Sequence, residues 1–301
     1  MTITLTGTGT SHGIPVIGCE CPVCRSSDPH DMRNRCSAYI QAGDTALVID
    51  TGPEFRLQAI KYKITHLDAV LITHSHADHL NGLDDLRIFS HTASADKNNR
   101  TEKILDIYAD APTIREIKTR FDYIYKATQQ GGGKPLLNLV NAENFTRENP
   151  ISVRRINGET NEKTPSGTGE LLCFPVPMLH GTLPTTGWNI RKKDAPPEKS
   201  FSYMTDCSFV PDESIELIQG TEHLVIDGLR EKPHVTHFSF EQALECAARI
   251  RPKHVWLTHI CHNNSHEQIN TWLAHHKKQF PSLADIPVHA AYDGLTLTIN
   301  S

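Results

Sequence analysis

The 301-residue chain lacks any uninterrupted apolar run of about 18 residues, the length that a membrane-spanning helix requires. Residues 1–6 contain neither a basic segment nor a long apolar stretch, so a secretion signal is not expected there. Net positive charge is also missing: the formal charge of −5 argues against broad electrostatic binding to nucleic acid, although a local basic groove stays open. We therefore expect a cytoplasmic protein without a membrane partner.

The composition is that of an ordinary globular protein, with 38% hydrophobic and 22% charged residues and no internal repeat or low-complexity tract. This length is ample for a large core. We expect a single domain over residues 1–301, with an inserted or elaborated segment at 111–170. Glycine-rich turns are expected inside that segment at 129–134 and 164–169.

Apolar alternation and turn residues predict a chain in which strands alternate with helices, an α/β (α+β) protein. Two helices have explicit start signals, because Ser239 and Ser265 are each followed three residues later by Gln, the capping-box pattern. The predicted helices are 54–62, 78–89, 239–250 and 265–278. The predicted strands are 1–6, 36–40, 45–49, 104–108, 171–178, 201–205, 223–226, 255–258 and 295–299.

A dense group of metal-ligand side chains follows the apolar run at 67–73. His74, His76, Asp78 and His79 lie within six residues. Neutral imidazole nitrogens and carboxylate oxygens are donors for zinc, manganese or iron, and an irregular loop after a strand can turn them toward different ions. The alternative, a polar loop that is rich in histidine by chance, does not explain the donors elsewhere in the chain.

Three further donors each follow a predicted strand: His180, Asp206 and His259. Strand ends that share one sheet edge would bring them together. Two ions would use the whole set. One ion would be held by His74, His76 and His180, the other by Asp78, His79 and His259, and Asp206 would bridge them. We also expect Asp78 and Asp206 to be catalytic residues. Ions about 3.5–4 Å apart can share a hydroxide and clamp a phosphoryl group. Cys207 is an alternative to Asp206, because a thiolate also binds metal ions. Adjacent strand residues point to opposite faces, so only one of the two can face the ions.

Three of the eight cysteines form a second cluster, Cys19, Cys21 and Cys24. Three thiols in six residues can wrap one tetrahedral ion and need one more donor, which favours a structural zinc. A redox Cys-x-x-Cys pair is the alternative, but it leaves Cys19 without a role. The isolated cysteines are expected to be small buried residues; they are Cys36, Cys173, Cys207 and Cys246.

The run 73–79, together with His180, Asp206 and His259, resembles the metallo-β-lactamase fold hydrolases over nearly the whole chain. This resemblance implies a four-layer αββα sandwich with a dinuclear metal site at one edge. Within that superfamily, residues 18–24 resemble the loop of the phosphoribosyl cyclic phosphate phosphodiesterases of the carbon–phosphorus lyase pathway. In that family the loop and a later histidine bind a structural zinc, and His262 matches the histidine, with Cys261 as a competing ligand.

The same resemblance implies a catalytic role for His237, which matches the residue that donates a proton to the departing oxygen. Asp50 and Asp227 are expected to orient ligand imidazoles or the loop. The remaining histidines singled out in the sequence are expected to have no role in the site; they are His12, His66, His234, His275 and His276.

These features predict a metal-dependent phosphodiesterase that uses hydroxide bound to two metal ions, with His237 as general acid. The expected substrate is a small phosphodiester, a class that includes cyclic phosphates. One alternative is a tRNA 3′-end endoribonuclease of the same superfamily, and another is a non-catalytic relative from cofactor biosynthesis. Residues 111–170 and 191–199 are expected to border the substrate. The sequence leaves open the native ion among zinc, manganese and iron, the exact substrate and whether the chain forms a homodimer.

Overall fold

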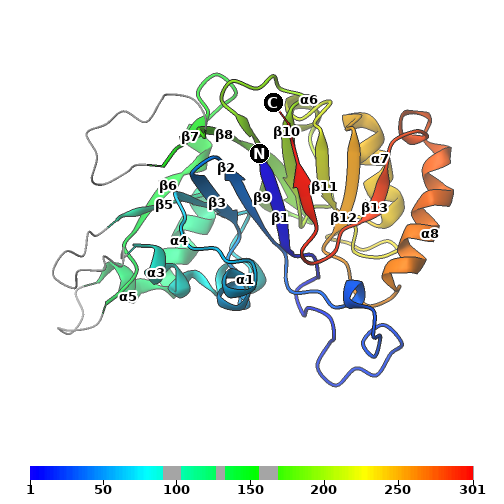
Figure 1. Cartoon of the computed structure of the whole chain (residues 1–301), viewed down its shortest axis with the longest axis horizontal. Coiled ribbons are helices and arrows are strands. Elements are labelled where there is room, and N and C mark those ends of the chain that lie inside the picture. Colours follow the sequence, from blue (N-terminus) through cyan, green and yellow to red (C-terminus); the bar gives the residue numbers. More distant parts are fainter. Residues whose placement is uncertain (91–102, 127–132, 156–168, 301) are drawn as a thin grey trace.

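The structure, a computed structural model, describes residues 1–90, 103–126, 133–155 and 169–300. Two mixed sheets pack face to face, and helices cover the outer face of each, which gives four layers (Figure 1). The αββα sandwich expected from the sequence is therefore confirmed. Most residues of the predicted turns at 129–134 and 164–169 lie outside the described residues.

The strands form two seven-stranded sheets. The first sheet runs in the order β14 (Thr296–Thr298), β1 (Thr2–Gly7), β2 (Ser37–Ala42), β3 (Thr45–Ile49), β4 (Ala69–Leu71), β5 (Leu105–Ala109) and β6 (Leu137–Asn141). The second runs in the order β13 (Val288–Ala290), β12 (His254–Thr258), β11 (His223–Asp227), β10 (Ser200–Met204), β9 (Leu183–Lys192), β8 (Leu171–His180) and β7 (Ile151–Val153). In each sheet a run of antiparallel pairs passes into a run of parallel pairs, at β3 and at β10.

The helices divide between the two outer faces. On the first sheet lie α1 (Phe55–Lys61), α2 (Ala77–Leu80), α3 (Arg87–Ser90), α4 (Ala111–Arg120) and α5 (Asp122–Tyr125), and on the second lie α6 (Asp212–Leu217), α7 (Phe240–Ile250) and α8 (His266–His276). Short 3₁₀ helices are η1 (Pro29–Asp31), η2 (Leu83–Leu86), η3 (Ala142–Asn144), η4 (Lys277–Gln279) and η5 (Pro281–Leu283). Both predicted capping boxes are present, at Ser239 and at Ser265.

The prediction of one helix over 78–89 is wrong, because α2, η2 and α3 replace it. The interruption lies at Gly82, whose amide donates to the carbonyl of Thr51 over 2.8 Å. A Cβ atom on Gly82 would lie 2.2 Å from the carbonyl oxygen of Gly52. The chain therefore leaves the helix to dock against the turn after β3, and only glycine permits so close an approach.

Strand β3 shows why the apolar runs are continuous rather than alternating. Leu47 and Ile49 face the core between the two sheets, whereas Ala46 and Val48 face the helices on the outside. A strand that is covered on both faces has no polar side. Removing a leucine or isoleucine side chain from water contributes about 1.5–3 kcal/mol, so packing on both faces holds the end of this strand in place.

The parallel pairs place several strand ends at one edge of the sandwich. Strands β10, β11 and β12 are mutually parallel, so Asp206, Asp227 and His259 emerge at the same edge of the second sheet. In the first sheet β3 and β4 are parallel, and they deliver Asp50 and His74. This edge is where the predicted ligands meet.

The segment 111–170 supplies α4, α5 and one edge strand of each sheet, β6 and β7. The loop at residues 191–199 was expected to border the substrate, but it lies away from this site. Ser200 pairs with Arg191 at the start of β10, whereas Asp206 follows the end of that strand. Since β9 runs antiparallel to β10, the loop between them lies at the opposite end of the sheet.

Away from the predicted ligands, His223 on β11 contacts His254 on β12, with ring centroids 4.6 Å apart. Burial and the neighbouring His254 lower the pKa of His223 to about 4. This pKa is below the value of about 6.5 in the unfolded chain. The contribution of the neutral His223 ring to folding stability is therefore fully present above pH 6.5 and is lost as the pH falls toward 4.

We expect His223→Gln to weaken this acid sensitivity, since glutamine can still accept the hydrogen bond from Trp256 Nε1. Melting temperatures of the wild type and the variant should converge as the pH falls from 7 to 5. His275→Gln, at an exposed histidine, serves as the control and should keep the wild-type pH dependence. Parallel curves for wild type and His223→Gln would contradict the assignment.

Candidate metal centre

Three residues of the site have left-handed backbone conformations at the ends of strands. Asp50, Asp206 and His259 have φ angles of 60°, 54° and 59°. Such a conformation turns a side chain sharply away from the direction of its strand. It costs about 1–3 kcal/mol in a non-glycine residue and persists only where the surroundings impose it.

The first predicted ligand set gathers around the loop after β4. The ring centroids of His74 and His76 are 4.5 Å apart, and that of His180 lies 5.8 Å from His74 and 5.3 Å from His76. His74 is buried, whereas His76 is exposed at the N-terminal boundary of α2. The structure thus brings together the three imidazoles that the sequence assigned to one ion.

The second predicted set is tighter and wholly buried. One donor atom from each of Asp78, His79, Asp206 and His259 lies within 4.8 Å of the others. His79 Nε2 is 3.1 Å from an oxygen of Asp78 and 3.1 Å from Asp206 Oδ2. The other oxygen of Asp206 is 3.2 Å from His259 Nε2 and 3.9 Å from His74 Nε2. Asp206 therefore faces both sets, and its Oδ1 lies near a nitrogen of each.

The buried nitrogens that face these carboxylates fit a cation. Among the described residues, the Nε2 atoms of His74, His79 and His259 are buried and make no hydrogen bond. His79 Nδ1 lies 2.7 Å from Asp50 Oδ2, so the ring proton donates there and Nε2 carries a lone pair. Lone pairs that point at carboxylate oxygens are stable only with a positive charge between them, and these donors suit divalent ions.

The electrostatic field of the site shows the same need for positive charge. Burial alone would lower the pKa of His79, but the carboxylates of Asp206, Asp78 and Asp50 raise it well above its usual range. His74 shows the opposite direction, because burial and the charge of His79 hold its pKa well below the usual range. Without metal, a proton would have to take the place that a cation would occupy beside His79.

Asp50 supports the ligand loop, as expected. Besides accepting from His79, its carboxylate accepts from the backbone N–H and from the hydroxyl of Thr73, both over 2.8 Å. The turn that follows Asp50 is itself tight, since a Cβ on Gly52 would lie 2.2 Å from the carbonyl oxygen of Asp78. Asp50 thus fixes both the ring of His79 and the start of the loop.

His237 lies at the border between the ligand sets. Its ring centroid is 4.4 Å from that of His180 and 4.5 Å from that of His259. Nδ1 donates to Asp227 Oδ2 over 2.7 Å, and the carboxylate also accepts from the backbone N–H of Cys207. Asp227 therefore orients His237 rather than a predicted ligand, and Nε2 of His237 is left for other chemistry.

The cysteine loop forms a separate cluster with His262. The Sγ atoms of Cys19, Cys21 and Cys24 lie 3.4, 3.5 and 3.4 Å from His262 Nδ1. Ligands on a tetrahedral zinc, with Zn–S of about 2.3 Å and Zn–N of about 2.0–2.1 Å, are about 3.5 Å apart. Cys261 lies outside this group, because its thiol hydrogen-bonds the side chain of Asn263 over 2.7 Å.

The thiols of this cluster differ in their environment. The backbone N–H of Cys24 lowers the pKa of the Cys21 thiol to about 6, whereas burial raises that of Cys24 to about 11. The four cysteines that were expected to be buried are buried; they are Cys36, Cys173, Cys207 and Cys246. Cys207 packs in the core beneath α7, so it does not compete with Asp206 for the site.

Two contacts at the site had no signal in the sequence. His180 Nδ1 lies 2.6 Å from the backbone carbonyl of Thr236, which leaves Nε2 free to bind an ion. Arg120, at the end of α4, donates to the backbone carbonyl of Ser75 over 2.6 Å, between two predicted ligands. Both involve backbone oxygens, which every residue carries, so only the fold could reveal them.

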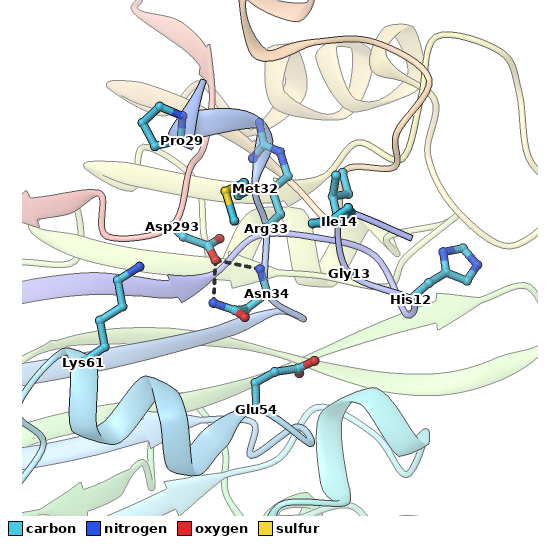
Figure 2. A pocket seen from close by; sticks show the side chains of 11 residues that line it. His12, Gly13, Ile14, Pro29, Met32, Arg33, Asn34, Glu54, Lys61 and Asp293 are labelled. Atoms are coloured by element: carbon cyan, nitrogen blue, oxygen red, sulfur yellow. Dashed lines mark hydrogen bonds between the residues drawn. The ribbon is translucent and has the colours of Figure 1, made fainter. Parts of the chain in front are cut away.

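A cavity of about 400 Å³ lies between α1 and the N-terminal loops (Figure 2). Asp293 lines the cavity, and its carboxylate accepts hydrogen bonds from the backbone and the side chain of Asn34. Lys61 and Glu54 line the cavity from the α1 side. None of the predicted metal ligands lines it. The candidate site is therefore the polar edge and not this cavity.

In the described part of the chain no helix is both long and apolar enough to cross a membrane. The family profile described as "Beta-lactamase superfamily domain" matches residues 45–260. That range covers β3 to the residue after His259, and so every predicted ligand of the two-ion site.

The chain is similar to a solved structure described as a diphosphatase from the PhnP family, with 33% identity, a TM-score of 0.73 and coverage of 99% of this chain and 98% of the other. It is 33% identical to an octanoyltransferase from Porphyromonas gingivalis over 98% of its length, but spans only 51% of that relative. A ribonuclease Z from Treponema denticola is 22% identical, with coverage of 86% of this chain and 92% of the relative.

Proposed function

Because the chain belongs to the metallo-β-lactamase superfamily and is a metal-dependent hydrolase, we propose that it hydrolyses a small phosphodiester or diphosphate. The observation that carries this proposal is the position of Asp206 between the two ligand sets. Its carboxylate lies 3.1 Å from His79 Nε2 in one set and 3.9 Å from His74 Nε2 in the other. A carboxylate in that place can join two cations, and paired cations suit the attacking and leaving oxygens of a phosphoryl displacement.

We propose that Asp78, His79 and His259 hold one ion, that His74, His76 and His180 hold another, and that Asp206 contacts both. When bound, these ions would supply Lewis acidity toward phosphoryl oxygens and would acidify water. Zinc, manganese and iron all suit these donors. Cys19, Cys21, Cys24 and His262 would hold a structural zinc, which ties the N-terminal loop to the strand end that carries His259.

His237 would donate the proton that the leaving oxygen needs. Its Nδ1 is occupied by Asp227, so the proton available for transfer is on Nε2. The carboxylate of Asp227 holds the ring in this orientation, as a triad carboxylate does for its histidine. The histidine is buried at the border of the site, so its ring is shielded from bulk water.

A second candidate activity is cleavage of precursor tRNA, which the match to ribonuclease Z favours. The net charge of −5 disfavours it, since binding to an RNA backbone depends on many positive contacts. The similarity to a diphosphatase of the PhnP family, which extends over nearly both whole chains, favours a small substrate.

The test is a substrate panel with metal-reconstituted protein. It should contain an aryl phosphodiester, a cyclic phosphate, a diphosphate, a phosphomonoester and a precursor tRNA. We expect turnover of the diester, cyclic or diphosphate compounds and none of the monoester. Cleavage of tRNA alone would overturn the small-substrate proposal and support the second candidate. The Asp206→Asn variant is the matched control for contaminating phosphatases.

A further inference from the structure

The turn formed by residues 234–236 lies beside two residues of the site. The ring centroid of His234 is 5.2 Å from that of His237. His234 and Val235 are exposed, whereas His237 is buried. Neither the ligand sets nor the proposed acid uses His234, so its place in the structure calls for a separate explanation.

The side chain of His234 closes this turn through hydrogen bonds. The backbone N–H of Thr236 donates to His234 Nδ1 over 3.3 Å, and the hydroxyl of Thr236 lies 3.2 Å from the same nitrogen. Because a backbone N–H can only donate, Nδ1 is the acceptor and a neutral ring carries its proton on Nε2. The imidazole thus fixes the peptide two residues ahead, as an aspartate or asparagine does in an Asx-turn.

The other side of Thr236 touches a predicted ligand. Its carbonyl oxygen accepts from His180 Nδ1 over 2.6 Å, which sets the tautomer that leaves His180 Nε2 free. The fit is close, because a Cβ atom on Gly181 would lie 2.9 Å from the Cγ2 atom of Thr236. A small movement of this turn would therefore shift the ring of His180.

We propose that His234 is a positioning residue that holds the Thr236 carbonyl in place and, through it, directs His180 toward its metal ion. The path runs from His234 Nδ1 to the Thr236 N–H, and from the Thr236 carbonyl to His180. The next residue along the chain is His237, so the same turn also places the general acid. His234 acts through these groups and not on the substrate.

Two substitutions at His234 separate positioning from direct chemistry. His234→Ala removes the acceptor and should weaken binding of one active-site ion about 10–100-fold, the cost typical of losing a group that orients a ligand. His234→Asn restores an acceptor for the Thr236 N–H but has no imidazole, and it should bind metal within about 3-fold of the wild type. Lys232→Ala, in the same exposed loop, is the control and should be unchanged.

Metal affinity is measured by competition with a chromophoric chelator, and the environment of the ion by the visible spectrum of the cobalt-substituted protein. The alanine variant should change both, and the asparagine variant neither. Wild-type affinity and spectrum in His234→Ala would overturn the proposal. So would equal loss of kcat in both variants with unchanged metal binding, because that result would assign the imidazole to the substrate.

This inference rests on the proposed function only in taking His180 as a ligand. The metal titration needs no substrate, so an inactive substrate panel would leave it testable. Conversely, failure of His234→Ala to alter metal binding would not affect the proposed hydrolysis.

Discussion

Asp206→Asn is expected to reduce phosphodiester hydrolysis more than about 10³-fold and to empty at least one of the two active-site positions. Losing a residue that merely orients a metal ligand typically costs about 10–100-fold, and Asp206 is placed to contact both ions itself. The amide keeps the size of the side chain but removes its negative charge and one of its oxygen donors. It also leaves the buried rings of His79 and His259 facing a neutral group.

Elemental analysis after metal loading, together with kcat on an aryl phosphodiester, would check this prediction. The variant should retain the ion at the cysteine cluster, whose donors lie elsewhere in the structure. A Cys24→Ser variant is the complementary control, which should lose that ion first. If Asp206→Asn kept full metal content and full turnover, the two-ion site would not be centred on this carboxylate.

His237→Ala is expected to keep its metal ions and to lose about 10²–10⁴-fold in kcat, the usual contribution of general acid catalysis. The loss should depend on the leaving group. A phenolate with strongly electron-withdrawing substituents needs little protonation, so its ester should be cleaved nearly normally, whereas an alkyl ester should show the full loss.

Asp227→Asn provides a matched companion, because it preserves the shape of the side chain beside His237 Nδ1 but not its charge. Its rate should fall for the alkyl ester and hold for the activated one, in the same pattern as His237→Ala. An equal loss on both esters in the histidine variant would contradict the proton-donor role and would point instead to a structural or metal-binding role for the ring.

The sequence predicted which donor side chains converge better than it predicted the elements that carry them. The donors at the ends of β4, β8, β10 and β12 follow apolar residues in the sequence. Strand ends at one edge of the sandwich converge, so the position of each donor at the end of an apolar run was enough to predict that the donors meet. Asp50 orients a predicted ligand imidazole as expected, whereas Asp227 contacts His237, which was not a predicted ligand. His237 and His262, in contrast, came from resemblance, since nothing in their local sequence marks them among 18 histidines.

The missed elements have physical reasons. Strand β9 contains Pro184 and Gly187, which usually end strands, yet long pairing with β8 holds it extended. The expected position of 191–199 failed because strand direction decides the end at which a loop lies, and β9 was not foreseen. The helix 78–89 failed at Gly82, where contact with the turn after β3 outweighs helix propensity.

The left-handed backbones of Asp50, Asp206 and His259 mean that the stability of the chain and the chemistry of the site favour different residues at these three positions. Glycine at any of the three positions would relax the chain while deleting a group that the site requires. A library selected only for heat resistance, with chelator present, would be drawn toward such replacements. Catalysis would then be the first property to disappear from the survivors, well before the sandwich itself weakened.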